Sequence, residues 1–196
     1  MILNLAAAYL IGSIPFGLIL SEIFGKGNLR ETGSGNIGAT NVLRTQGKLL
    51  GLATFLLDFL KAYAACRFFS TENENVNLLI LAAPVIGHMF PVWLKFKGGK
   101  GVASYFGVLF FLNPLLFLGT ILVWCMVFLF TKISSISGLV SIIASVCIFS
   151  AMKYFEHAEF LNQSILLSVL AVLMIIKHKQ NIIRLIKHEE NSCLQH

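Results

Sequence analysis

The chain has 196 residues, of which 57% are hydrophobic and only 12% charged, and its mean hydropathy is +0.81. This number of charged residues is too small to build a water-facing surface of ordinary charge density. The composition therefore excludes a soluble globular domain and indicates an integral membrane protein. The net charge of +6 is divided among short segments without a long basic face, which argues against nucleic acid and leaves membrane orientation and anionic substrates to explain it.

Seven apolar blocks follow one another along the chain, and a helix needs about 20 apolar residues to cross a bilayer. They cover roughly residues 3–24, 49–70, 76–94, 102–112, 114–130, 136–152 and 162–177. Asn113-Pro114 interrupts an apolar run that is too long for one helix and so separates the fourth block from the fifth. We expect one all-α polytopic domain over residues 1–196 with about seven transmembrane helices, the first of them a retained span, although merging the weaker blocks would leave five.

Lys and Arg concentrate in every second connection between these blocks. Twelve of the fifteen lie after the first, third, fifth and seventh blocks: Lys26, Arg30, Arg44, Lys48, Lys95, Lys97, Lys100, Lys132, Lys177, Lys179, Arg184 and Lys187. The other connections hold Glu72, Glu74, Lys153, Glu156 and Glu159. Because short cytoplasmic loops carry the positive excess, we expect the N-terminus outside, the C-terminus in the cytoplasm, and every glycine-rich polar segment on the cytoplasmic side.

The first polar segment, residues 27–44, combines glycines, short hydrogen-bonding side chains and cations. Glycine lets the backbone approach a ligand closely, and the guanidinium fork suits oxyanions. The combination predicts a phosphate site with these candidate residues: Ser34, Gly35, Asn36, Gly38, Thr40, Asn41 and Arg44. A flexible linker between two helices would also be rich in Gly and Ser, but it would gain nothing from flanking cations.

The second polar segment, residues 87–104, contains the sequence KGGKG directly before an apolar helix. We expect its backbone N–H groups and ammonium groups to converge on a second oxyanion site, formed by Lys97, Gly98, Gly99, Lys100 and Gly101. It is not a Walker A loop, since Lys100 is followed by Gly rather than Ser or Thr. His88 precedes this loop and is either a structural histidine or a member of the site.

Two charged residues, Asp58 and Lys61, lie inside the second apolar block. They are three residues apart and therefore share one helix face, which must point to the protein interior because charges are costly in lipid. The pair either ties helices together or supports the site.

Two further polar segments follow. Residues 132–141 open the sixth block with serines, of which Ser137 is a candidate for substrate binding, while helix capping explains the group equally well. Residues 177–190 predict a short amphipathic helix on the inner membrane surface, with His178, Asn181 and Arg184 on one face. The four cysteines, Cys66, Cys125, Cys147 and Cys193, have no metal or redox spacing, and we expect neither a metal site nor a cofactor.

These residues together resemble the bacterial acyl-phosphate:glycerol-3-phosphate acyltransferase family, also called the PlsY family. The resemblance rests on YLIGSIPFGLIL at 9–20, GSGNIGATNVLR at 33–44, GHMFPVWLKFKGGKGVA at 87–103, and His178, Asn181, Ile182, Arg184, Leu185 and Glu190 in the tail. One departure is His188, which stands where the family usually has Gly before its Glu. It leaves open whether Glu189 or Glu190 matches the family's acid.

The resemblance implies a seven-helix protein of the bacterial inner membrane whose active site faces the cytoplasm. The implied reaction transfers a fatty acyl group from acyl-phosphate to the 1-hydroxyl of sn-glycerol 3-phosphate, giving 1-acylglycerol 3-phosphate and phosphate, the first step of phospholipid synthesis. Neither acyl-CoA nor acyl carrier protein is the direct donor. The implied partners are the two substrates, the bilayer and an upstream enzyme that forms acyl-phosphate.

Roles are implied residue by residue. Ser34 and Arg44 match the positions for acyl-phosphate and catalysis, and the loop at 97–101 matches the glycerol 3-phosphate site. His178 and Asn181 match a catalytic polar pair, and Glu190 matches a residue needed for structural integrity.

The main alternative is a membrane transporter of small phosphorylated solutes, favoured by intramembrane charge and broken helices. Polar loops confined to one side argue against it, because alternating access needs gates on both sides. A non-enzymatic subunit would not need two oxyanion sites, and an acyl-CoA enzyme with a His-Asp pair lacks its Asp after His88.

The polar segments contain no Ser-His-Asp or Cys-His arrangement, so the sequence favours direct attack of the hydroxyl over an acyl-enzyme. We expect the donor's phosphate to accept the proton, with His178 orienting a substrate.

Overall fold

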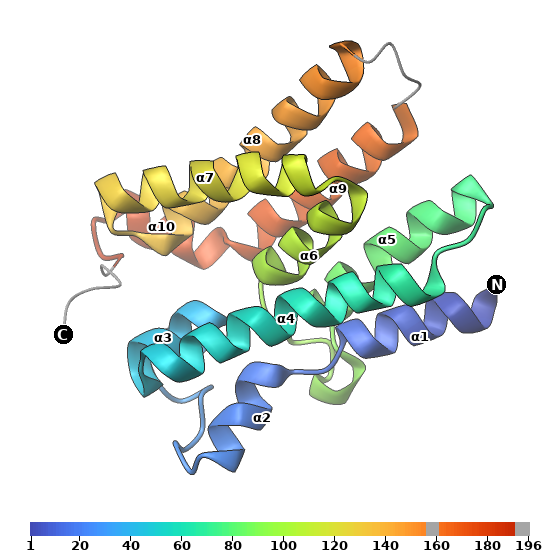
Figure 1. Cartoon of the computed structure of the whole chain (residues 1–196). Helices are drawn as coiled ribbons and strands as arrows, with labels where there is room; N and C mark the ends of the chain where they lie inside the picture. The colour runs from blue at the N-terminus through green and yellow to red at the C-terminus, as the bar shows by residue number, and fades with distance from the viewer. Residues whose placement is uncertain (156–160, 191–196) are drawn as a thin grey trace. The chain divides into compact units, whose positions relative to one another are not determined.

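The computed structural model describes residues 1–155 and 161–190, and within these ranges all regular structure is helical (Figure 1). The chain forms two compact units, Met1–Phe111 and Leu112–His196. Three residues named above, Glu156, Glu159 and Cys193, lie outside the described residues.

In the first unit, small residues allow two of the helices to pack closely. Its elements are α1 (Ile2–Gly12), α2 (Phe16–Ile23), α3 (Ala39–Gln46), α4 (Lys48–Phe69), α5 (Glu74–Met89), a 3₁₀ turn (Val92–Leu94) and α6 (Val102–Leu112). A Cβ on Gly12 would lie 2.3 Å from the Pro84 backbone, and one on Gly87 would lie 2.3 Å from the Tyr9 carbonyl. Glycine thus lets α1 and α5 approach backbone to backbone, as small residues do between membrane helices.

The first apolar block, expected as a single span, is broken. Its two halves, α1 and α2, meet at an angle of 45°. The break falls at residues 13–15, where Pro15 has no N–H to give and disfavours helical backbone in the residue before it. At this break the carbonyl of Ile14 accepts hydrogen bonds from the N–H of Phe16 at 3.2 Å and from Nζ of Lys61 of α4 at 2.7 Å.

In the second unit, three long helices and one short helix follow each other: α7 (Pro114–Thr131), α8 (Ser134–Phe155), α9 (Leu161–Lys177) and α10 (Lys179–Ile186). Asn113 caps α7, since its Oδ1 accepts the N–H groups of Leu115 at 2.8 Å and Leu116 at 3.2 Å. Pro114 occupies the first turn, where a missing N–H costs nothing. The break predicted at Asn113-Pro114 is confirmed. A bend of 58° separates α9 from α10.

Among the residues that the structure describes, four helical stretches are long and apolar enough to cross a membrane: Lys48–Phe69, Glu74–Leu94, Pro114–Thr131 and Ser134–Phe155. Counting each bent pair, α1 with α2 and α9 with α10, as one span gives six, while the apolar helix α6, with 11 residues, is too short to be counted. All seven predicted blocks are therefore helical, while the number that cross remains between four and six by this criterion. Large hydrophobic side chains of α7 are exposed, among them Leu115, Leu118, Leu122 and Met126, as on a helix that faces lipid.

Candidate active site

The glycine-rich segment before α3 is folded around the side chain of Asn41. The amide nitrogen of Asn41 donates to the carbonyls of Leu29 at 3.3 Å and Thr32 at 3.1 Å, and its Oδ1 accepts the N–H of Ser34 at 2.8 Å. Asn41 is buried, so these bonds are shielded from water. Predicted as a substrate ligand, Asn41 instead has its amide occupied by the loop that it shapes.

Two glycines of this loop are required by the fold itself. Gly33 has φ +58, and a Cβ there would lie 2.4 Å from Oδ1 of Asn41; Gly35 has φ +67. Gly38 differs, because its φ is −83 and the nearest atom to an added Cβ is Oδ1 of Asn36 at 3.7 Å. No contact within the first unit requires glycine at position 38. The remaining reason for a glycine there is that it keeps the N-terminus of α3 accessible to a ligand.

The predicted donors of this segment lie around α3. Ser34 is half-buried beside Asn41, Thr40 stands in the first turn of α3, and Asn36 accepts the N–H of Gly38 at 3.2 Å. Arg44 lies in the last turn and is half-buried. The first-turn N–H groups of a helix have no intrahelical acceptor and carry partial positive charge, so the start of α3 can hold an oxyanion.

The second loop uses part of its backbone for its own fold. The N–H of Gly98 donates to the Met89 carbonyl at 3.2 Å, and that of Gly99 donates to the His88 carbonyl at 3.1 Å. The prediction that the N–H groups of 97–101 are presented to a ligand is therefore wrong for these two residues. The donors suited to an anion are the first-turn N–H groups of α6, from Val102 onward, which follow Lys100 and Gly101.

The two loops lie together in the first unit. A terminal guanidinium nitrogen of Arg30 donates to the carbonyl of Lys97 at 2.6 Å, and Leu94 packs on the small core of Leu29, Ile37 and Val42. The side chain of Lys97 is exposed, whereas Lys100 is half-buried. From the sequence, Arg30 is only a cation that could bind an oxyanion. Nothing in the sequence indicates that its partner is a backbone carbonyl 67 residues away.

A buried polar cluster lies behind the second loop. Asp58, Lys61 and His88 are buried, with Nζ of Lys61 2.6 Å from Oδ1 of Asp58 and 3.0 Å from Nδ1 of His88. The expected ion pair is thus present, faces the protein interior, and includes the histidine that precedes the loop.

In the second unit, the carboxylate of Glu190 folds back onto α10 and α8. It accepts hydrogen bonds from Asn181 at 2.7 Å, Nε of Arg184 at 2.6 Å and Oγ of Ser135 at 3.1 Å. Burial raises the pKa of the Glu190 carboxyl, but the hydrogen bonds from Arg184, Asn181 and Ser135 and the charge of Arg184 outweigh it, so this pKa lies below its ordinary value of 4.5. Glu189 is exposed, so Glu190 is the acid that faces inward.

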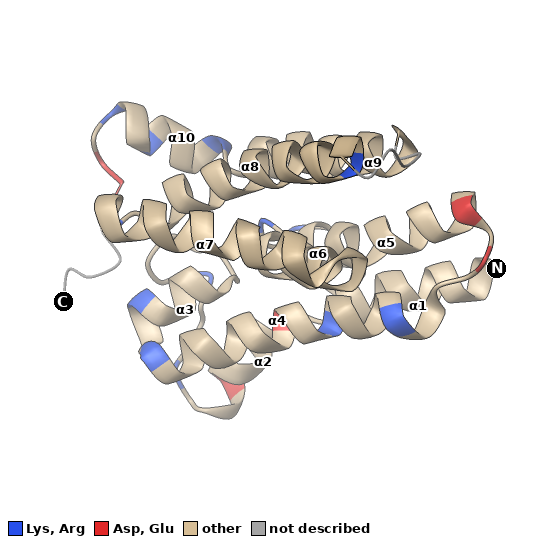
Figure 2. Cartoon of the chain, turned by 45° about the horizontal axis from the view of Figure 1, so that its top comes forward, with Lys and Arg blue, Asp and Glu red and all other residues tan. Residues whose placement is uncertain are grey.

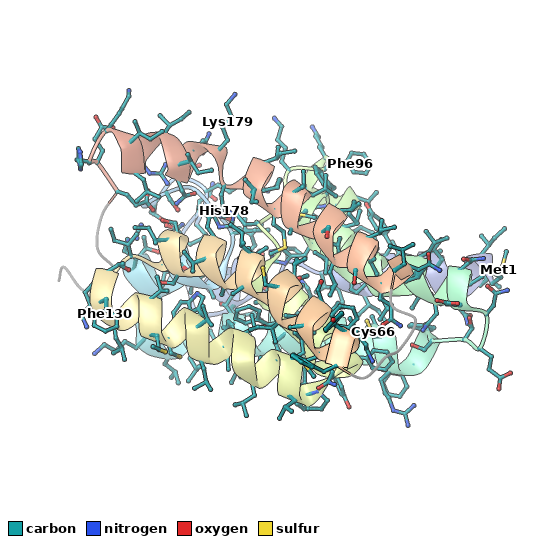
Figure 3. The ribbon with its side chains drawn as sticks, turned by 90° about the horizontal axis from the view of Figure 1, so that it is seen from above. Met1, Cys66, Phe96, Phe130, His178 and Lys179 are labelled. Carbon is teal, nitrogen blue, oxygen red and sulfur yellow. The ribbon has the colours of Figure 1, made fainter. Side chains whose placement is uncertain are left out.

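His178 lies at the junction of α9 and α10 and is buried (Figure 3). Its Nδ1 is 2.7 Å from the Met174 carbonyl, which can only accept, so Nδ1 carries a proton and Nε2 is an acceptor in the neutral ring. Ser137 is fully buried and its hydroxyl donates to the Ile133 carbonyl at 2.9 Å, so it bonds back to its own helix instead of capping it.

A sequence model described as glycerol-3-phosphate acyltransferase matches residues 2–188. The chain belongs to the glycerol-3-phosphate acyltransferase family. The acyltransferase is 44% identical over 190 residues to a glycerol-3-phosphate acyltransferase of Sinorhizobium fredii, covering 97% of this chain and 91% of that protein. It is also 44% identical over 184 residues to one of Pelagibacter ubique, covering 94% and 93% respectively.

The fold agrees with solved structures of the same family. The crystal structure of PlsY (YgiH), an integral membrane glycerol 3-phosphate acyltransferase in its glycerol 3-phosphate form, matches with a TM-score of 0.88 and 36% identity over 97% of this chain and 94% of that one. Its lysophosphatidic acid form matches with a TM-score of 0.83 and 34% identity. The family predicted from the sequence is confirmed, and with it an all-helical membrane acyltransferase of phospholipid biosynthesis.

Proposed function

We propose that this acyltransferase takes its acyl group from an acyl-phosphate and transfers it to the 1-hydroxyl of sn-glycerol 3-phosphate, releasing 1-acylglycerol 3-phosphate and inorganic phosphate. The observation that carries the proposal is the pairing of two glycine-rich loops, each leading into a helix N-terminus, through Arg30 and the Lys97 carbonyl. Two phosphorylated substrates require two oxyanion sites. A donor without a phosphate at its reactive end would leave the second of these sites without a ligand. The glycerol 3-phosphate and lysophosphatidic acid forms of PlsY support the acceptor and the product.

In the first unit, we assign the start of α3 with Ser34, Thr40 and Arg44 to the acyl-phosphate. These groups stabilise the departing phosphate and the oxyanion that forms on the acyl carbonyl. The start of α6, with Lys97, Lys100 and Gly101, binds the phosphate of glycerol 3-phosphate.

In the second unit, His178 and Asn181 act on the hydroxyl. Nε2 of His178 can accept the hydroxyl hydrogen and so orient its oxygen, while Arg184 and Glu190 hold Asn181 in place. The hydroxyl oxygen forms a bond to the acyl carbon, the bond from that carbon to the phosphate oxygen breaks, and the hydroxyl proton passes to the phosphate. An acyl-phosphate is already activated, so alignment and charge neutralisation supply most of the catalysis.

The proposed location is the bacterial inner membrane, with the N-terminus outside and the loops in the cytoplasm. Support comes from the charges of the first unit (Figure 2). Basic residues gather around α3 and the start of α4, at Lys48, while the acidic residues Glu72 and Glu74 stand beyond the other end of α4. Under the positive-inside rule, this distribution supports loops on the cytoplasmic side.

Reconstituted pure protein tests this function. With acyl-phosphate and glycerol 3-phosphate in the outer solution, we expect equal amounts of inorganic phosphate and 1-acylglycerol 3-phosphate, detected by a phosphate assay and mass spectrometry. Acyl-CoA and acyl carrier protein in place of acyl-phosphate should give no product. Turnover with either of these, or uptake of labelled glycerol 3-phosphate into the vesicles without acylation, would contradict the proposal and favour the other enzyme class or the transporter.

A further inference from the structure

The ammonium group of Lys61 makes three hydrogen bonds inside the first unit. Its Nζ lies 2.6 Å from Oδ1 of Asp58, 2.7 Å from the Ile14 carbonyl and 3.0 Å from Nδ1 of His88, and it stands 5.7 Å from the centre of the Phe16 ring. An ammonium has three donors and no acceptor, so its capacity is used completely. Lys61 therefore links α4 to the break between α1 and α2 and to the last turn of α5.

These contacts determine which nitrogen of His88 carries the proton. A neutral Lys61 would leave the buried Asp58 carboxylate without the cation that stands 2.6 Å from it, so the proton between Lys61 and His88 belongs to Lys61. The carboxylate is farther from the ring, with Oδ1 of Asp58 3.5 Å from Nδ1 of His88. Nδ1 of His88 accordingly accepts from Lys61, and in the neutral ring the proton is on Nε2.

Nε2 of His88 lies directly against the second loop. A Cβ built on Gly99 would be 2.2 Å from Nε2, so the ring edge occupies the space that a side chain at 99 would need. The main chain is fixed as well, because the His88 carbonyl accepts the N–H of Gly99 at 3.1 Å. His88 thus holds this glycine through both its backbone and its ring.

We propose that Asp58 and Lys61 are positioning residues of the acyltransferase. They hold His88 as the Nε2–H tautomer, so that an N–H donor stands at Gly99, beside the phosphate of glycerol 3-phosphate. The inference rests on the proposed function only for the place of the acceptor. An ion pair that served stability alone would not require a histidine whose ring abuts the phosphate loop.

The test removes both charges at once. Asp58→Asn with Lys61→Met keeps the side-chain sizes and avoids leaving a buried carboxylate without its partner. His88 is then no longer forced to accept at Nδ1, so we expect the Kd and the KM for glycerol 3-phosphate to rise about tenfold, the typical effect of losing a hydrogen bond to a charged group. The KM for acyl-phosphate should stay at its wild-type value.

Two controls separate positioning from stability. Tyr9→Phe removes the 2.6 Å hydrogen bond from the Tyr9 hydroxyl to the Phe90 carbonyl, at the same end of α5, and should lower the Tm without changing the affinity for glycerol 3-phosphate. In a His88→Gln background, the paired substitution at 58 and 61 should cause no further loss of affinity, because it acts through His88. An additional loss there, or wild-type affinity in the folded pair variant, would overturn the proposal.

The tautomer is measured on the unmodified protein, which keeps the inference testable whether or not the variant with both Asp58 and Lys61 replaced folds. With ¹⁵N-labelled histidine, the signals of His88 among the five histidines are those missing from His88→Gln. We expect a protonated Nε2 and an unprotonated Nδ1 at neutral pH, and the reverse pattern or a doubly protonated ring would refute the inference. Calorimetry with glycerol 3-phosphate alone needs no acyl donor, so binding without turnover of acyl-phosphate would count against the donor proposed above and leave this inference standing.

Discussion

His188 ends α10 in a backbone conformation that residues with a side chain rarely adopt. Its φ is +58, its N–H donates to the Leu185 carbonyl at 3.1 Å, and the N–H of Glu189 donates to the Arg184 carbonyl at 2.8 Å. This is the Schellman pattern of helix ends, in which glycine usually takes the left-handed position. The turn sends Glu190 back onto Asn181 and Arg184, through a backbone conformation that glycine would adopt without strain.

His188→Gly should therefore stabilise the protein. Removing the left-handed strain of a residue with a Cβ is worth about 1 kcal/mol, or about 2–4 °C in Tm for a chain of this size. Thermal unfolding in detergent measures it, with Glu189→Gly as the matched control, since Glu189 is not among the positive-φ residues. A lower Tm for His188→Gly would mean that the imidazole makes a contact worth more than the strain.

Ser34→Ala and Arg44→Lys should each reduce turnover strongly while leaving the protein folded. Loss of one preorganised donor to the transition state costs about 3 kcal/mol, or about two decades in kcat. Lysine keeps the charge of Arg44 but loses the fork. Phosphate release from acyl-phosphate in the presence of glycerol 3-phosphate gives the rate, and a wild-type rate in either variant would remove that residue from the assignment.

Glycines in the two loops are needed for different reasons, and alanine substitution distinguishes them. A Cβ on Gly98 would lie 2.2 Å from the His88 carbonyl and 2.3 Å from Cδ of Pro91, so Gly98→Ala should lower the Tm and the activity toward both substrates. Gly38→Ala meets no atom closer than 3.7 Å and should stay within about 1 kcal/mol in stability. Its KM for acyl-phosphate should nevertheless rise, because the added methyl narrows the approach to α3.

Stability curves and initial-rate kinetics for the two alanine variants decide this prediction. A stable Gly98→Ala enzyme with only the glycerol 3-phosphate KM raised would show that ligand approach, not loop packing, sets the need for glycine at 98.

The link between α8 and α10 through Glu190 predicts a loss of stability in acid. The folded pKa of Glu190 is below its ordinary value of 4.5, so its contribution is fully present above about pH 4.5 and is lost as the pH falls from there through the folded pKa. The Tm of Glu190→Gln should be lower than that of the wild type at pH 7, and the two should converge as the pH falls below 4.5. Glu189→Gln, at an exposed neighbour, should follow the wild-type curve throughout.

The sequence predicts helices well here because apolar blocks and prolines determine them locally. Asn113-Pro114 predicts both an N-cap residue and the first residue of a helix, and the structure has both. Pro15 carries a similar signal, yet the apolar run around it favours a single span, and the break becomes intelligible only with Lys61 as partner for the Ile14 carbonyl. Asn41 illustrates the limit for site residues, since an amide that binds its own loop and one that binds a ligand have the same sequence signature.

At the scale of the whole molecule, the proposed reaction brings two phosphorylated compounds to a protein that has few charges. Interactions with phosphate are stronger at low dielectric than in water, so a small number of well-placed Arg, Lys and N–H donors suffices. The hydroxyls that open α8 are already committed, with Ser135 donating to Glu190 and Ser137 to the Ile133 carbonyl. A backbone carbonyl cannot serve as the base of a nucleophilic serine, so Ser137 is not arranged for acylation.

Direct attack predicts that the protein is never acylated. Mixed with acyl-phosphate alone, the enzyme should release no burst of phosphate, because an acyl-enzyme would release one equivalent per active site before acceptor is added. Intact-protein mass spectrometry after quenching in acid checks for the adduct, and Ser34→Ala serves as the control for the one loop serine assigned to the donor. If wild-type protein gains the mass of one acyl group in stoichiometric amount and Ser34→Ala does not, the reaction passes through an ester of Ser34. Unmodified protein that releases phosphate only after glycerol 3-phosphate is added is the result expected if the hydroxyl attacks acyl-phosphate itself.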